Sequence, residues 1–238
     1  MAVKELLGQL HEVAECPRKQ LERYLGEGRR VIAMAPVYGP QEIVHSMGLV
    51  PMGVWGADVE INEAKKYYPA FICSVMQTIL ELGIKGEYKG VSAIIIPSLC
   101  DSLKTLGQNW KYAVADIPFI PMTYPQNRKQ DYGRVISSLE VATGARFSEP
   151  ALVKSNAIYN EHNRVMREFA EIASYADITA TQRSDVFKSA WFMTVEEHTA
   201  IVKELNEELK KGARAEGKLR VLVTGILADS PSLLKIFD

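Results

Sequence analysis

Short apolar runs alternate with longer segments of helical periodicity along the first half of the chain. Runs rich in Val, Ile and Met, with few polar positions, are typical of strands that are covered on both faces of a parallel sheet. The predicted strands are Arg30–Ala35, Leu49–Trp55, Val91–Pro97 and Pro118–Thr123, and the predicted helices are Pro40–Met47, Cys73–Leu82 and Ser102–Ala113. This alternation indicates βαβ crossovers, and it predicts a flavodoxin-like or Rossmann-like parallel α/β domain over residues 30–130.

The second half of the chain has a different pattern, which is long, charged and helical. The predicted helices are Asp131–Thr143, Ser148–Tyr175, Thr181–Trp191 and Thr194–Lys211. They define a helical region over residues 131–218, and residues 1–29 are expected to form an N-terminal helical segment. An apolar run, Leu219–Thr224, then predicts a new strand, and Pro231 is well placed to begin a helix. We therefore expect residues 219–238 to be the first βα unit of a truncated second α/β domain.

Composition and charge narrow the classes of partner. The chain has 238 residues and a formal net charge of −1. Because a basic surplus is missing, neither nucleic acid nor an anionic membrane is expected as a partner. The N-terminus lacks the apolar core of a signal peptide, and the apolar runs are too short to span a bilayer, so we expect a cytoplasmic protein. The sequence has no Walker loop, so the chain itself is not expected to bind ATP.

Two of the three cysteines lie where metal chemistry is favoured. Cys73 begins a predicted helix, where backbone N–H groups and the helix dipole stabilise a thiolate. Cys100 follows the predicted strand Val91–Pro97, and ligands of open parallel sheets bind at the carboxyl ends of the strands. Thiolates at such an edge suit an iron–sulfur cluster or zinc. The spacing alone leaves open that both are ordinary buried thiols, and Cys16 has no comparable position.

Glu42 and His45 are a second candidate pair. They are three residues apart in the predicted helix Pro40–Met47, so they share a face that begins at the same sheet edge. A carboxylate and an imidazole in that arrangement could act as a catalytic acid and base. The alternative is that Glu42 caps the helix and that His45 lies at a surface or interface.

Several separated motifs resemble the 2-hydroxyglutaryl-CoA dehydratase D-component family. The similarity covers the chain from about Val31 to its end, and the likeness is to the β-type subunit of (R)-2-hydroxyacyl-CoA dehydratases. The matching motifs are Pro36–His45, Gly48–Pro51, Pro69–Ser74, Cys100–Ser102, Gly107–Trp110, Pro125–Arg128 and Val223–Ser230. Their number and their order make the resemblance specific.

The resemblance implies a subunit of an oxygen-sensitive lyase of anaerobic amino-acid fermentation. It implies a [4Fe–4S] cluster with Cys73 and Cys100 as two of its three cysteine ligands. The third ligand is expected in the missing C-terminal half, so that the 238 residues alone are expected to be inactive. The implied partners are an α-type dehydratase subunit, an ATP-dependent iron–sulfur activator protein and a 2-hydroxyacyl-CoA substrate.

The family's chemistry is a radical dehydration. One electron, supplied at low potential, converts the thioester to a ketyl radical anion that expels the 2-hydroxyl group, and the electron returns at the end. Two alternatives stay open. One is a subunit of the benzoyl-CoA reductase type, and the other is a cluster-free interaction subunit without catalytic activity.

Overall fold

The structure is a computed structural model that describes residues 3–36, 38–123, 130–212, 214–215, 221–224 and 229–238. Contacts divide the chain into two units. Unit 1 consists of Met1–Gln20 and Ala157–Asp238, and unit 2 consists of Leu21–Asn156. The first residues of the chain therefore group with its helical second half, which the sequence pattern does not indicate. Among the described residues, no helix is both long enough and apolar enough to cross a membrane.

Unit 2 contains a parallel sheet of four strands. The strands are β1 (Val31–Met34), β2 (Val50–Gly53), β3 (Ala93–Pro97) and β4 (Phe119–Met122). Their order is β2-β1-β3-β4, and every neighbouring pair is parallel. The predicted fold class, an α/β parallel sheet, is therefore confirmed. Pro51 is accommodated because β2 is an edge strand that pairs with β1 alone, and an edge strand tolerates the missing N–H donor.

Helices cover both faces of this sheet, as the uniformly apolar strands predict. They are α3 (Gln41–Ser46), α4 (Ser74–Ile84), α5 (Asp101–Ala113) and α6 (Gln130–Thr143), with a 3₁₀ turn, η1, at Ala64–Lys66. Ile32 and Met34 alternate with Val31 and Ala33, so they point to the face that packs against α3 and α6. The opposite face packs against α5, where Gly107 lies against Phe119. Helix α6, which the sequence pattern groups with the helical region, is therefore part of the sheet's core.

Unit 1 is built from helices. They are α1 (Val3–Glu15), most of α7 (Glu149–Ile172), α8 (Ala180–Ser189), α9 (Val195–Lys211) and α10 (Pro231–Phe237), while α2 (Pro17–Gly26) and α7 cross the unit boundary. Leu6 and Leu10 of α1 are completely buried and belong to the same apolar cluster as Phe169 of α7 and Val202 of α9. Burial of this shared face holds the N-terminal helix to helices more than 150 residues later in the chain.

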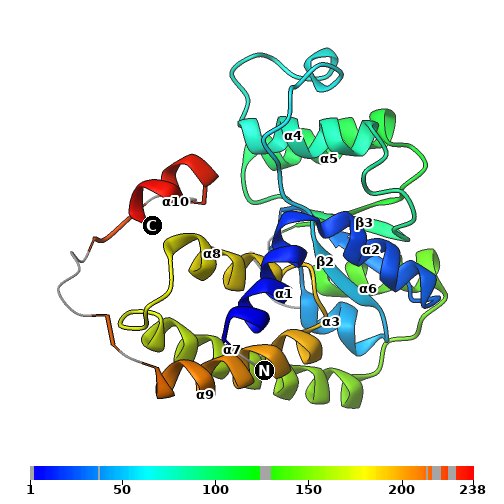
Figure 1. Ribbon diagram of the computed structural model, residues 1–238. Coiled ribbons are helices and arrows are strands. Elements are labelled where there is room, and N and C mark those ends of the chain that lie inside the picture. Colours follow the sequence, from blue (N-terminus) through cyan, green and yellow to red (C-terminus); the bar gives the residue numbers. More distant parts are fainter. Residues whose placement is uncertain (1–2, 37, 124–129, 213, 216–220, 225–228) are drawn as a thin grey trace. The chain divides into compact units, whose positions relative to one another are not determined.

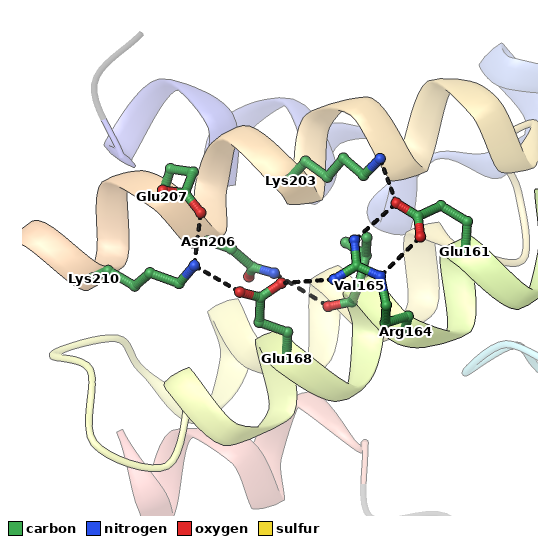
Figure 2. Close-up of polar contacts among 8 residues, drawn as sticks. All are labelled: Glu161, Arg164, Val165, Glu168, Lys203, Asn206, Glu207 and Lys210. Atoms are coloured by element: carbon green, nitrogen blue, oxygen red, sulfur yellow. Dashed lines mark hydrogen bonds and ion pairs between the residues drawn. The ribbon is translucent and has the colours of Figure 1, made fainter.

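Helices α7 and α9 also meet through a band of ion pairs (Figure 2). Lys203 of α9 lies 2.6 Å from Glu161 of α7, and Lys210 lies 2.6 Å from Glu168. Beneath these exposed pairs, the Asn206 amide donates a hydrogen bond of 3.2 Å to the carbonyl oxygen of Val165. Charged residues of this region therefore pair across the two helices, and the pairs favour one alignment of α7 along α9.

The predicted strand Leu219–Thr224 is wrong in its described part. Val221–Thr224 has irregular backbone and pairs with no described strand, whereas Leu219 and Arg220 lie outside the described residues. A strand needs a neighbour to accept and donate its ladder hydrogen bonds, and Leu222, which is 92% exposed, has no covering layer. The helix predicted at Pro231 does form, as α10, with Ser230 at its N-cap. The proposed domain boundaries themselves stay a prediction.

Candidate cofactor site and neighbouring pocket

Cys73 and Cys100 occupy equivalent positions in unit 2. Cys73 is the N-cap residue of α4, and Cys100 is the N-cap residue of α5. Both thiols are free and exposed, and neither makes a side-chain capping hydrogen bond. Each sulfur therefore adjoins the backbone N–H groups of a helix N-terminus and stays available to a ligand. These groups and the helix dipole stabilise negative charge on a thiolate.

Helices α4 and α5 lie side by side (Figure 1). They run in the same direction, because α4 leads into β3, α5 leads into β4, and these strands are parallel. Near the end of α4, a Cβ added to Gly83 would come within 2.8 Å of the Trp110 ring and 3.0 Å of Val114, both at the end of α5. Because the two helices end together, they also begin together. Cys100 lies three residues after β3 ends at Pro97, so the beginnings of both helices lie at the carboxyl edge of the sheet. That the two sulfurs converge there stays a prediction.

The segment before Cys73 is fixed by a buried carboxylate. Glu81 of α4 is completely buried, and its Oε2 accepts hydrogen bonds from the backbone N–H groups of Ala64 at 2.8 Å and Asn62 at 3.1 Å. Lys85 Nζ lies 3.0 Å from its Oε1. Burial opposes ionisation of Glu81, but the Ala64 N–H, Lys85 and the Asn62 N–H outweigh it, so the pKa of Glu81 lies below its ordinary value. The long connection from β2 to α4 is thus tied to the helix that Cys73 begins.

Two further hydrogen bonds hold the approach to Cys73. The Gln77 side chain of α4 donates to the Ile72 carbonyl oxygen at 2.9 Å. The Asn109 side chain of α5 donates to the Tyr67 carbonyl oxygen at 2.8 Å. Since Asn109 belongs to the helix that Cys100 caps, the segment that carries one cysteine is bonded to the helix that carries the other.

Glu42 and His45 lie on α3, but their side chains have different surroundings. Ser155 of α7 donates its hydroxyl hydrogen to the Glu42 carbonyl oxygen at 2.8 Å. The Ser155 oxygen lies 2.9 Å from His45 Nδ1, so His45 donates an N–H to it. Ser155 is 1% exposed, which makes this a buried contact between α3 and α7. The sequence gives no signal for Ser155, because a lone serine in a long helix is unremarkable.

Glu42, by contrast, lines a pocket of about 420 Å³ in unit 2. The pocket lies where β1 and β4 end and α3 begins, at the carboxyl edge of the sheet. Its described lining residues are Tyr38, Gly39, Pro40, Glu42, Ile43, Met122, Tyr132, Leu152 and Asn156. Neither His45 nor a cysteine is among these described residues. The segment Pro125–Arg128, a motif of the family resemblance, lies outside the described residues.

The two cysteines fit part of an iron–sulfur site. Exposed thiols at two helix N-termini offer soft anionic ligands and neighbouring N–H donors, which suits a cluster of iron and sulfide. Cys16, which stands between α1 and α2, belongs to unit 1 rather than unit 2. The described residues of unit 2 therefore contain two cysteines, Cys73 and Cys100, that could bind such a cluster.

The sequence places the chain in a family of acyl-CoA enzymes. The family described as "2-hydroxyglutaryl-CoA dehydratase, D-component" matches residues 36–238. The chain belongs to this family. It is 42% identical to the (R)-phenyllactyl-CoA dehydratase beta subunit of Clostridium sporogenes, over 95% of the chain and 64% of that protein. It is 43% identical to the lactoyl-CoA dehydratase subunit beta of Anaerotignum propionicum, over 99% of the chain and 66% of that protein.

A more distant relative comes from a different reaction class. The chain is 27% identical to a benzoyl-CoA reductase subunit of Thauera aromatica, over 86% of the chain and 57% of that protein. The chain spans about two thirds or less of the length of each of these relatives. The higher identity to the two dehydratase subunits favours the dehydratase group within the family.

Proposed function

We propose that the chain is part of the β-type subunit of an (R)-2-hydroxyacyl-CoA dehydratase, which removes water from a 2-hydroxyacyl-CoA thioester. The observation that carries this proposal is the pair of exposed cysteines at the N-caps of two adjacent, parallel helices. They occur in a chain that is 42% and 43% identical to two dehydratase β subunits.

Cys73 and Cys100 would hold a [4Fe–4S] cluster, together with a third cysteine from a C-terminal portion that this sequence does not include. When bound, such a cluster supplies one-electron transfer at low potential. The chain's own contribution is to bind and orient it. The N–H groups that begin α4 and α5 stabilise the thiolates, while Glu81 and Asn109 fix the backbone before Cys73. One-electron reduction of the substrate thioester gives a ketyl radical anion, from which the 2-hydroxyl group can leave.

The surface around the cysteines supports an assembly with other subunits. Phe71, two residues before Cys73, is 89% exposed, and Leu99, immediately before Cys100, is 41% exposed. Large apolar side chains beside a reactive site favour cover by protein, because burial removes them from water and also excludes water from the site. An α-type subunit and an ATP-dependent activator protein are the partners that this proposal requires.

Measurements of activity and iron content distinguish this proposal from a reductase-type subunit and from an interaction subunit without a cluster. The full-length subunit, its α-type partner and the activator would be tested under anaerobic conditions on a series of (R)-2-hydroxyacyl-CoA thioesters. The proposal predicts dehydration with far fewer electrons consumed than molecules converted. A reductase consumes electrons in proportion to its product, and an interaction subunit without a cluster contains no iron. Either of those results would contradict the proposal.

A further inference from the structure

A histidine and two carboxylates meet in unit 1. His11 and Glu15 are four residues apart in α1, so they project from the same side of the helix. Asp185 of α8 faces them, and its Oδ2 accepts a hydrogen bond of 2.8 Å from His11 Nδ1. One ligand atom from each of the three side chains lies within 4.8 Å of the other two. The cluster therefore combines an imidazole nitrogen with two carboxylate oxygens from two packed helices.

An ion pair between His11 and Asp185 does not explain why a second carboxylate, Glu15, lies beside them. The Asp185 side chain is only 5% exposed, and burial of an ionised carboxylate is costly unless positive charge is close. The carboxylate of Glu15 brings a second negative charge to the same place. A cation that both carboxylates could share would relieve this repulsion.

We propose that His11, Glu15 and Asp185 bind one divalent transition-metal ion of the zinc type and so clamp α1 to α8. One imidazole nitrogen and two carboxylate oxygens are suitable zinc ligands, and water would take the fourth position, because His11 and Glu15 are exposed. The ligand atoms would draw together to about 3.4 Å from one another in a tetrahedral site. The imidazole nitrogen makes Mg²⁺ and Ca²⁺ poorer candidates, since these ions select oxygen ligands.

Cobalt(II) is the probe that separates this site from the cysteines. Co²⁺ replaces Zn²⁺ in tetrahedral sites, and its spectrum contains a charge-transfer band only when a thiolate binds it. The purified chain, freed of metal by a chelator, would be titrated with Co²⁺, and its thermal unfolding would be measured with and without Zn²⁺. We expect one equivalent bound by nitrogen and oxygen ligands, without a thiolate band, and a higher unfolding midpoint in Zn²⁺.

Glu15→Gln is the decisive variant, because it retains the His11–Asp185 hydrogen bond and removes the third ligand. We expect it to weaken Co²⁺ binding about tenfold or more, and not to lower the midpoint without metal, because the repulsion between the two carboxylates is removed as well. Glu12→Gln is the matched control, since Glu12 is an exposed carboxylate in the same helix outside the cluster, and it should bind Co²⁺ as the unaltered chain does. Binding that Glu15→Gln leaves intact, a thiolate band without a nitrogen–oxygen site, or a midpoint that Zn²⁺ does not raise would show that the cluster is an ion pair only.

Discussion

The Glu81 carboxylate accepts a hydrogen bond of 2.8 Å from the backbone N–H of Ala64, seventeen residues earlier. Glu81 is completely buried in α4, the helix that begins after Cys73, and Ala64 lies in the connection that leads to Cys73. The contact thus links the position of a cysteine to a charged group inside the protein. Because Asn62 and Lys85 also bond to this carboxylate, its loss should destabilise the whole connection from β2 to α4.

Glu81→Gln tests that link. The neutral amide loses the ion pair to Lys85 and accepts more weakly from the two backbone N–H groups, so we expect a loss of about 2 kcal/mol in the free energy of unfolding. Urea unfolding at neutral pH would measure it. Glu60→Gln, an exposed position in the same connection, is the control and should change stability little. Since the folded pKa of Glu81 is lowered, its contribution is present above the ordinary value of 4.5 and is lost as the pH falls through the folded pKa.

Gly83→Ala tests the contact between α4 and α5. The added methyl group would lie 2.8 Å from the Trp110 ring, so the helices have to separate, and we expect a loss of about 1–3 kcal/mol in the free energy of unfolding. Gly8→Ala is the matched control, because Gly8 is also helical but a Cβ there meets no atom within 4 Å. Alanine should stabilise that position by about 1 kcal/mol. Equal effects at both positions would show that the Gly83 contact does not constrain the two helices.

The sequence predicts the parts of this structure that depend on local pattern. The four strands and the helices between them form close to their expected positions, because continuous apolar runs require cover on both faces. The position of Cys73 at the start of a helix also follows from the pattern, whereas α5 begins one residue earlier than predicted, which makes Cys100 its N-cap. The pairing of His45 with Ser155 and the packing of α1 on α8 could not be predicted, since they join residues more than 100 positions apart. Val221–Thr224 does not form the predicted strand, because strand propensity is realised only beside another strand.

Glu42 and His45 should respond differently to substitution. Glu42 lines the pocket, so Glu42→Gln should reduce the activity of the assembled enzyme about a hundredfold, if its carboxylate transfers a proton, and should leave the unfolding free energy nearly unchanged. His45→Gln should mainly lower stability, by about 1 kcal/mol, because it disturbs the buried bond to Ser155. Steady-state kinetics and urea unfolding of both variants would separate the two roles. Full activity of Glu42→Gln would contradict a catalytic role for Glu42.

Because His198 is buried, we predict that the protein loses stability in mild acid. Its Nε2 donates to the Val186 carbonyl oxygen at 3.0 Å, and its Nδ1 accepts from His162 at 3.0 Å. Burial, together with His162, lowers the pKa of His198 from 6.5 to about 3. Below pH 6.5, His198 is protonated in the unfolded chain, whereas in the folded chain it stays neutral down to about pH 3. The free energy of unfolding therefore falls as the pH decreases through this range.

The expected slope is up to about 1.4 kcal/mol per pH unit for this one residue. Urea unfolding between about pH 7 and pH 5 would measure this slope, because ordinary carboxylates titrate below that range. His198→Gln should flatten the pH dependence, although it also lowers stability at neutral pH through loss of buried hydrogen bonds. A slope that the substitution leaves unchanged would assign the effect to other groups.

Iron content tests directly whether Cys73 and Cys100 bind an iron–sulfur cluster. Iron and acid-labile sulfide would be measured per subunit after anaerobic purification of the full-length protein and of its Cys73→Ser, Cys100→Ser and Cys16→Ser variants. Because a serine oxygen is a poorer ligand than a thiolate for such a cluster, we predict that the first two variants lose most of their iron. Cys16→Ser, which alters the cysteine of unit 1, should retain the unaltered iron content. Unchanged iron in Cys73→Ser and Cys100→Ser, or no iron in the unaltered subunit, would show that these cysteines do not bind a cluster.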